Sequence, residues 1–228
     1  MQNKIIFSTL LCLSMLQAND GVNDWNISSE LRVGYVNYTH PSPDTEGVYT
    51  VPKVSILTPT LNGFSAKTTF AAVTDFGINN NAYERGNLVF DATENKSFAI
   101  LQELYFSYTD NIHSLTIGRQ ELVTPLLEAD DYYFLANSYE AINYINTSID
   151  NVDIHLGYVH KMSGVWDSGA NGTEFHSMSD ASFVDSRDKQ NANDSGVFYG
   201  GLEYSKDAHS FKVWEYYLSD LYNMALAQ

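Results

Sequence analysis

One stretch of the chain, residues 122–137, combines carboxylates with large apolar side chains. Its acids are Glu128, Asp130 and Asp131, and its large apolar groups are Leu126, Leu127, Tyr132, Tyr133 and Phe134. A connection that simply lies in water does not need so many large apolar groups. We therefore expect a loop that packs its rings against the protein and keeps its carboxylates next to water, where their charge acts on nearby ions.

Other chemistry has little support in the sequence. The histidines are scattered, with no HExxH motif and no other metal-ligand spacing; they are His40, His113, His155, His160, His176 and His209. The chain has no GxSxG elbow, no GxGxxG run and no phosphate-binding loop, so neither an enzyme nor a cofactor is predicted. Cys12 is the only cysteine, which excludes a disulfide framework.

The chain is acidic, with a formal net charge of −16 at pH 7, and this excludes nucleic-acid binding through the net field. The simplest interpretation is that acids solubilise loops that face water. Divalent-cation binding at those loops and a preference for cationic solutes are the alternatives. Residues 167–174 weakly resemble a calcium loop, but Gly169 stands at the third position, where an acid is usual, so a plain loop is favoured over a calcium site.

Nine stretches alternate apolar and polar residues, as strands with one apolar face do. They are residues 25–38, 48–57, 64–72, 97–108, 114–121, 138–145, 151–161, 196–204 and 210–217. In the seventh, Leu156 lies on the apolar face and Gly157 on the polar face, so Gly157→Ser is expected to cost far less stability than Leu156→Arg. The pattern predicts an all-β, antiparallel fold.

Two of these stretches depart from the alternation. In the fourth, Gln102 falls on the apolar side. In the fifth, Arg119 and Glu121 share parity with Ile117, and we expect a bulge near Gly118 that turns these charges inward.

The connections alternate between short and long. The short ones are residues 58–63, 109–113, 146–150 and 205–209, and the long ones are residues 39–47, 73–96, 122–137 and 162–195. Outer-membrane barrels sort their connections in this way, and about ten tilted residues cross the hydrocarbon layer. Many of the 16 Tyr, 12 Phe and 3 Trp lie at strand ends, where rings settle among lipid headgroups. The sequence thus predicts a transmembrane β-barrel in the bacterial outer membrane, in contact with outer-membrane lipid.

The strand count and the N-terminal segment suggest how the chain is organised. Single-chain bacterial barrels close with an even number of strands, and residues 221–228 show no amphipathic closing strand, so nine strands predict about half of an eighteen-stranded barrel. Residues 1–18 read as a secretory signal peptide, because Lys4 precedes an apolar run and Ala18 offers a small residue for cleavage. We expect a signal peptide at 1–18 and a portion of a porin barrel at 19–228.

A block between residues 117 and 141 is the most specific motif. Its residues are Ile117, Gly118, Arg119, Gln120, Glu121, Leu122, Thr124, Pro125, Asp130, Asp131, Asn137, Tyr139, Glu140 and Ala141. This block resembles the outer-membrane porin D (OprD) family, particularly porins of epsilon-class proteobacteria. The resemblance implies an eighteen-stranded porin whose third extracellular loop, here residues 122–137, folds into the lumen and narrows it.

The resemblance also implies which side chains line the passage. Basic wall residues face the loop acids in that family, and the candidates here are Arg32, Lys67, Arg119 and Lys161. The full set of expected constriction and lumen residues is Arg32, Lys67, Glu103, Arg119, Glu121, Glu128, Asp130, Asp131, Tyr132, Glu140 and Lys161. None of them is expected to be catalytic or to bind a metal.

The predicted function is passive or substrate-selective diffusion of small hydrophilic solutes and ions, with charge at a narrow passage favouring one sign. A homotrimer is expected. The alternatives are a barrel enzyme, whose residues can lie on separate strands without forming a motif, and a surface adhesin that uses the loops. A soluble antiparallel sheet also alternates, but it has no reason to sort its connections by length.

Overall fold

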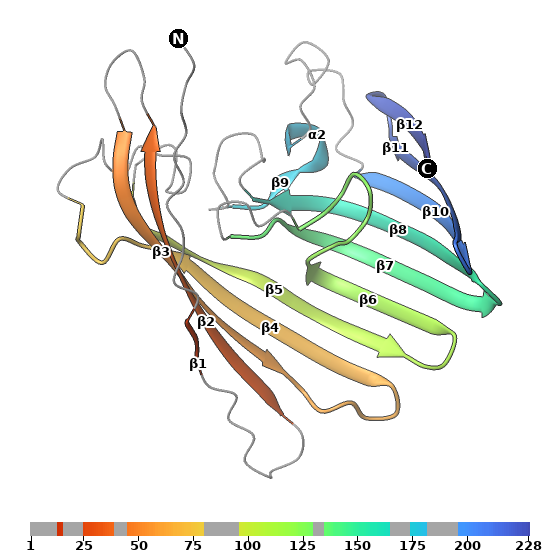
Figure 1. Cartoon of the computed structure of the whole chain (residues 1–228), viewed down its shortest axis with the longest axis horizontal. Helices are drawn as coiled ribbons and strands as arrows, with labels where there is room; N and C mark the ends of the chain where they lie inside the picture. Colours follow the sequence, from red (N-terminus) through yellow and green to blue (C-terminus); the bar gives the residue numbers. More distant parts are fainter. Residues whose placement is uncertain are drawn as a thin grey trace.

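The computed structural model describes residues 13–15, 25–38, 45–79, 96–129, 135–164, 174–181 and 196–228. These residues form one twelve-stranded sheet and one short helix, α2 (Met178–Ala181) (Figure 1). The strands are β1 (Leu13–Met15), β2 (Asn26–Tyr38), β3 (Thr45–Leu57), β4 (Phe64–Val73), β5 (Phe98–Thr109), β6 (His113–Gln120), β7 (Ser138–Ile149), β8 (Val152–Ser163), β9 (His176–Ser177), β10 (Val197–Lys206), β11 (His209–Leu218) and β12 (Tyr222–Ala227). Within this part of the chain, no helix is long and apolar enough to cross a bilayer.

The strands follow one another as antiparallel neighbours. The order is β1-β2-β3-β4-β5-β6-β7-β8-β10-β11-β12, and β9 lies off this path, paired with β8. The hairpin turns β3–β4, β5–β6, β7–β8 and β10–β11 lie at one end of the sheet (Figure 1). All nine predicted strands are confirmed, and so is the antiparallel all-β fold.

The expectation for residues 221–228 is wrong. They form β12, which pairs with β11 from Leu218↔Tyr222 to Val213↔Ala227, so the described part of the chain has ten long strands rather than nine. The alternation in β12 is weak because Asn223 and Ala225 give one of its faces only small or polar side chains. Pairing with the edge of β11 makes this segment a strand.

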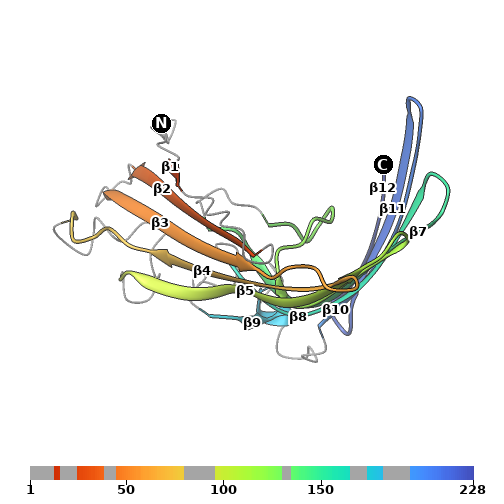
Figure 2. The ribbon, with the colours of Figure 1, turned by 90° about the horizontal axis from the view of Figure 1, so that it is seen from below.

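The sheet curves into an open trough, and the connection from β6 lies over its concave side (Figure 2). The opposite, convex side carries a row of large apolar side chains that are exposed. They include Phe64, Phe70, Leu104, Phe106, Ile117, Ile142, Leu156, Phe198, Leu202, Phe211, Val213 and Tyr217. The concave side holds the polar partners of the alternation, together with two buried clusters.

Both buried clusters include residues of the connection between β6 and β7. The larger one comprises Leu122, Leu127, Tyr139, Ala141, Val159, Met162, Met178, Val197, Tyr199, Trp214, Tyr216 and Leu218. The smaller one comprises Tyr49, Val51, Ala71, Val73, Ile100 and Leu135. Because Leu122 and Leu127 belong to one cluster and Leu135 to the other, this connection packs on two separate parts of the wall.

Bulges adjust which residues face the concave side. Opposite the Thr69/Phe70 step of β4, strand β5 carries one extra residue, Gln102, which therefore leaves the apolar side and is buried on the concave side. The bulge expected near Gly118 is absent from the register, because β6 pairs without a shift with both β5 and β7. Gly118 instead has a φ of 127°, and a Cβ there would lie 2.3 Å from the carbonyl oxygen of Leu104.

Part of the predicted signal peptide is described as a strand. Leu13–Met15 forms β1, which pairs with Ser29 to Leu31 at the edge of β2. Residues 1–12 and 16–24 lie outside the described residues, and the signal peptide stays a prediction.

Candidate functional site

The connection between β6 and β7 turns back on itself over the concave face. The backbones of Val123 and Glu128 pair as in an antiparallel β-sheet. The Thr124 hydroxyl donates to the Leu127 carbonyl at 2.9 Å, and the Leu127 N–H donates to the Thr124 hydroxyl at 3.0 Å. Leu122 and Leu127 are buried, whereas Leu126 is exposed. Residues 122–128 therefore form a compact turn that holds two leucines against the wall.

Wall residues hold this turn through hydrogen bonds. The Tyr139 hydroxyl donates to the Glu128 carbonyl at 2.9 Å, and the Asn137 amide donates to the same carbonyl at 3.3 Å. From the other side, the Leu126 N–H donates to the Tyr216 hydroxyl at 3.4 Å. The turn is thus bound to β7 and to β11.

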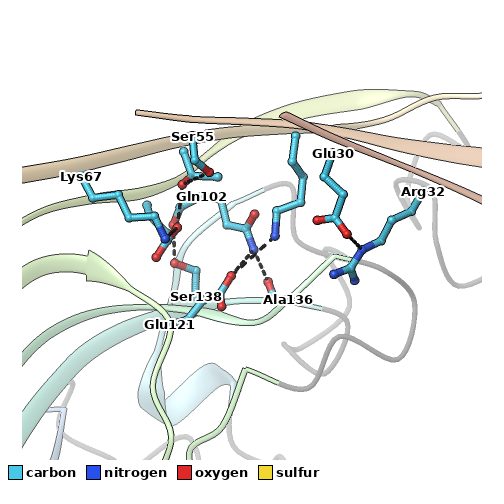
Figure 3. A network of polar contacts seen from close by, with 11 residues as sticks. Glu30, Arg32, Ser55, Lys67, Gln102, Glu121, Ala136 and Ser138 are labelled. Carbon is cyan, nitrogen blue, oxygen red and sulfur yellow. Dashed lines mark hydrogen bonds and ion pairs between the residues drawn. The ribbon is translucent and has the colours of Figure 1, made fainter. Parts of the chain in front are cut away.

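A charged network lies on the concave side of β2 to β5 (Figure 3). Lys67 contacts Glu103 at 2.7 Å, and the Thr69 hydroxyl donates to the same carboxylate oxygen at 2.6 Å. Ser55 shares a 2.8 Å hydrogen bond with Thr69. Glu103 is only 4% exposed, so its charge needs these donors.

Lys53 borders the same hollow as this network and contacts the residue that begins the connection from β6. Its ammonium lies 3.7 Å from Glu121, which also accepts a 3.3 Å hydrogen bond from Gln102 (Figure 3). Gln102 in turn donates to the Ala136 carbonyl at 3.1 Å, so one side chain binds both ends of the connection. Glu121 reaches the concave side because the chain leaves β6 there, not because of a bulge.

Sequence reasoning missed Lys53 and Gln102. The alternation in residues 48–57 places Lys53 on the same side as Ser55, and that signal was available in the sequence. Gln102 was visible as an exception to the alternation, but the pattern did not show that a bulge turns it to the concave side.

Two hollows adjoin along this wall. One, of about 350 Å³, is lined by Ser28, Ser29, Glu30, Lys53, Ser55, Lys67, Glu103 and Glu121. The other, of about 330 Å³, is lined by Arg32, Lys53, Glu121, Leu122, Val123, Glu128, Ala129 and Ala136. Lys53 and Glu121 border both. Arg32, which lies 2.6 Å from Glu30, thus shares a hollow with the loop acid Glu128.

The described charges around these hollows are nearly balanced. The bases are Arg32, Lys53 and Lys67, and the acids are Glu30, Glu103, Glu121 and Glu128. Each base lies within 4 Å of a carboxylate, so the basic wall residues do not form a bare positive ladder. Such an arrangement can attract ions and polar solutes of either sign, with a slight excess of negative charge.

Arg119, Glu140 and Lys161 lie elsewhere. Arg119 contacts Glu140 at 3.0 Å, donates to the Leu101 carbonyl at 3.4 Å, and stacks on the Phe175 ring at 4.2 Å. Lys161 pairs with Glu140 in the register of β7 and β8. None of these three residues is among those that line the two hollows. Of the four predicted basic wall residues, Arg32 and Lys67 therefore border the hollows, and Arg119 and Lys161 do not.

Three predicted site residues, Asp130, Asp131 and Tyr132, lie outside the described residues, as do residues 167–173 of the weak calcium-like loop.

Comparison with solved structures identifies the fold. The chain superposes on the crystal structure of Pseudomonas aeruginosa OccK9 (OpdG) with a TM-score of 0.72 at 17% identity, covering 90% of this chain and 53% of that one. A BenF-like porin from Pseudomonas fluorescens Pf-5 gives 0.71 at 14% identity, with 90% and 52% covered. Pseudomonas aeruginosa OccK2 (OpdF), solved in complex with glucuronate, gives 0.67 at 15% identity, with 89% and 48% covered.

These neighbours are porins, and the chain shares their barrel fold over about half of their length. They support the resemblance to the OprD family at the level of fold. No protein-family model matches the chain, and no curated protein sequence matches it either.

Proposed function

We propose that this chain forms part of an outer-membrane porin of the OprD type, through which small hydrophilic solutes and ions diffuse. The observation that carries the proposal is the position of residues 121–129 and 135–137, which fold over the polar concave face of a sheet whose convex face is apolar. In a closed barrel the concave face becomes the lumen and the connection narrows it, while the convex side chains contact lipid. The epsilon-proteobacterial type and a homotrimer belong to the same proposal.

The solute class follows from the hollows beside the loop. Lys53 and Lys67, with the hydroxyls of Ser28 and Ser55, offer donors to carboxylate and hydroxyl groups, and Glu121 and Glu128 attract cationic groups. One structural neighbour binds glucuronate, a small solute that carries both a carboxylate and hydroxyls. Because charge at a narrow passage is focused by low-dielectric walls, we propose that these side chains select solutes by charge and size.

The direct test is single-channel recording of the full-length porin that contains this chain, reconstituted in planar bilayers. We expect stepwise conductance, and a reversal potential in a salt gradient that reports ion preference. Absence of conductance from a barrel that is folded and inserted would overturn the proposal. An enzyme would then be sought by hydrolysis of peptide or lipid substrates, and an adhesin by binding to surface glycans.

Charge selectivity gives a second, sharper test. Neutralising Glu121→Gln together with Glu128→Gln should shift the reversal potential toward anions, most strongly at low salt, because the screening length is roughly 10 Å at about 0.1 M. The matched control neutralises Asp185, Asp188 and Asp194, acids of the long connection at residues 162–195, and should change little. A larger shift from the control would place the selective charges away from the hollows.

A further inference from the structure

Four aromatic residues of one buried cluster lie on the wall beside the turn at residues 122–128. We call Tyr139 on β7, Tyr199 on β10, and Trp214 and Tyr216 on β11 the aromatic platform, and each is at most 4% exposed. Trp214 and Tyr216 stack with their ring centroids 6.1 Å apart, and Tyr199 lies 6.1 Å from each of them. Leu122 and Leu127 of the loop belong to the same buried cluster. The platform is therefore covered by the turn at residues 122–128.

Glycines let two of these rings lie close to the backbone of the wall. A Cβ at Gly157 would lie 2.1 Å from the Tyr199 ring, and a Cβ at Gly201 would lie 2.5 Å from the Trp214 ring. Gly157→Ser would therefore require the Tyr199 ring to move, and the prediction that it costs far less than Leu156→Arg stays a prediction. The two glycines thus leave the space on the wall that the Tyr199 and Trp214 rings occupy.

The three tyrosine hydroxyls of the platform differ in what they bind. Tyr139 donates to the Glu128 carbonyl and Tyr216 accepts from the Leu126 N–H, so both bind the backbone of the turn. Tyr199 instead donates to Asn143 on β7 at 2.6 Å, within the wall itself. The chain thus contains a matched control, a hydroxyl in the same cluster that does not bind the loop.

We propose that Tyr139 and Tyr216 are positioning residues that hold residues 122–128 across the lumen and so set the width of the passage beside Glu128. This inference rests on the proposed porin function. The two hydroxyls come from different strands and bind backbone atoms two residues apart, and Leu127 between them belongs to the same buried cluster as the rings. Apolar packing alone is non-directional, whereas the hydrogen bonds specify one position of the turn.

Removing both hydroxyls should leave the apolar contacts intact and allow the turn to occupy other positions. A hydrogen bond within the protein replaces one to water and so contributes only modestly. Losing one hydroxyl should therefore change the ratio between the observed position of the turn and other positions by a few-fold. For Tyr139→Phe with Tyr216→Phe we expect the time spent away from the main open level to rise roughly tenfold, which corresponds to about 1.4 kcal/mol.

The test uses single-channel recordings of the full-length porin in three forms: unmodified, Tyr139→Phe with Tyr216→Phe, and Tyr199→Phe. Heat-modified gel mobility reports whether each barrel is folded. We expect the double variant to fluctuate between conductance levels while it keeps the mobility of the unmodified barrel. Tyr199→Phe should stay within about twofold of the unmodified channel, because its lost bond is to the wall.

Each outcome bears on the proposal. Steady conductance in a folded double variant overturns it, and so does equal fluctuation in Tyr199→Phe, because the effect would then come from the cluster and not from the loop. If the double variant does not fold, the single variants decide, and each should raise the fluctuation about threefold. A folded, unmodified barrel without conductance overturns the porin function itself.

Discussion

The two halves of the concave face differ in what lies at their centres. From β2 to β5 the wall carries ion pairs and hydroxyls around hollows, with Lys67–Glu103 at its centre. From β7 to β11 it carries buried rings on glycines, with Trp214 at the centre. The connection from β6 packs Leu122 and Leu127 on the second half and Leu135 on the first, and its Glu121 and Glu128 border a hollow of the first half. Under the proposed function, substitutions among the charges around the hollows should affect permeation as well as stability, whereas substitutions under the rings should act mainly on stability.

The largest effect should come from the convex face, which both halves share. Leu156→Arg places a charge on an exposed apolar surface that we assign to lipid, and it should cost about 2–4 kcal/mol if the site lies near mid-membrane. A folding titration of the full-length porin into bilayers measures this cost. The conservative Leu156→Ile serves as control. A negligible cost for Leu156→Arg would indicate that this face is in water.

Neighbouring glycines test the aromatic half. Gly201→Ala forces a Cβ into the Trp214 ring and should destabilise the barrel by about 1–3 kcal/mol. Gly200→Ala points to the convex side, where the nearest atom is 3.7 Å away, and should be nearly neutral. Urea unfolding midpoints in micelles compare the two. Equal midpoints would mean that the platform can shift without strain.

The buried ion pair tests the charged half. Glu103→Gln leaves Lys67 without its carboxylate and should cost about 1–2 kcal/mol, less than a fully buried pair because the Lys67 side chain is 28% exposed. Glu30→Gln, at a more exposed pair with Arg32, should cost less than about 1 kcal/mol. The same unfolding experiment measures both. The reverse ranking would show that Glu103 is not the centre of the network.

The smallest effect should come from a turn that belongs to neither half. Asp110 accepts hydrogen bonds from the N–H groups of Ile112 and His113 at 2.9 and 2.7 Å, and these bonds lower the pKa of its carboxyl below the ordinary 3.8. Its contribution to stability is therefore fully present above that value and is lost as the pH falls through the lowered pKa. Unfolding midpoints of the unmodified protein and Asp110→Asn should differ slightly at pH 7 and converge in acid. A difference that persists in acid would assign the effect to packing.

The sequence by itself determined the strands. Alternation with period two is a local property, because successive side chains point to opposite faces, so all nine expected strands appear. The lengths of the connections can also be read along the chain once the strands are located, and their alternation between short and long indicated a barrel. β12 escaped notice because its face of small residues carries no such signal.

Only the tertiary structure decided which charges meet. A bulge places Gln102 on the concave side, and Glu121 reaches that side because the chain leaves β6 just before it; alternation encodes neither feature. Arg119 forms an ion pair with Glu140 instead. Lys53 could be assigned to a face but not to a partner, because Glu121 lies beyond the end of β6, far from Lys53 in sequence. The buried cluster that packs against the loop combines residues from distant parts of the chain. Its rings on β10 and β11 lie over glycines on β8 and β10, and its leucines follow β6. Contacts between residues far apart in sequence depend on register and curvature, and these are set by the whole sheet.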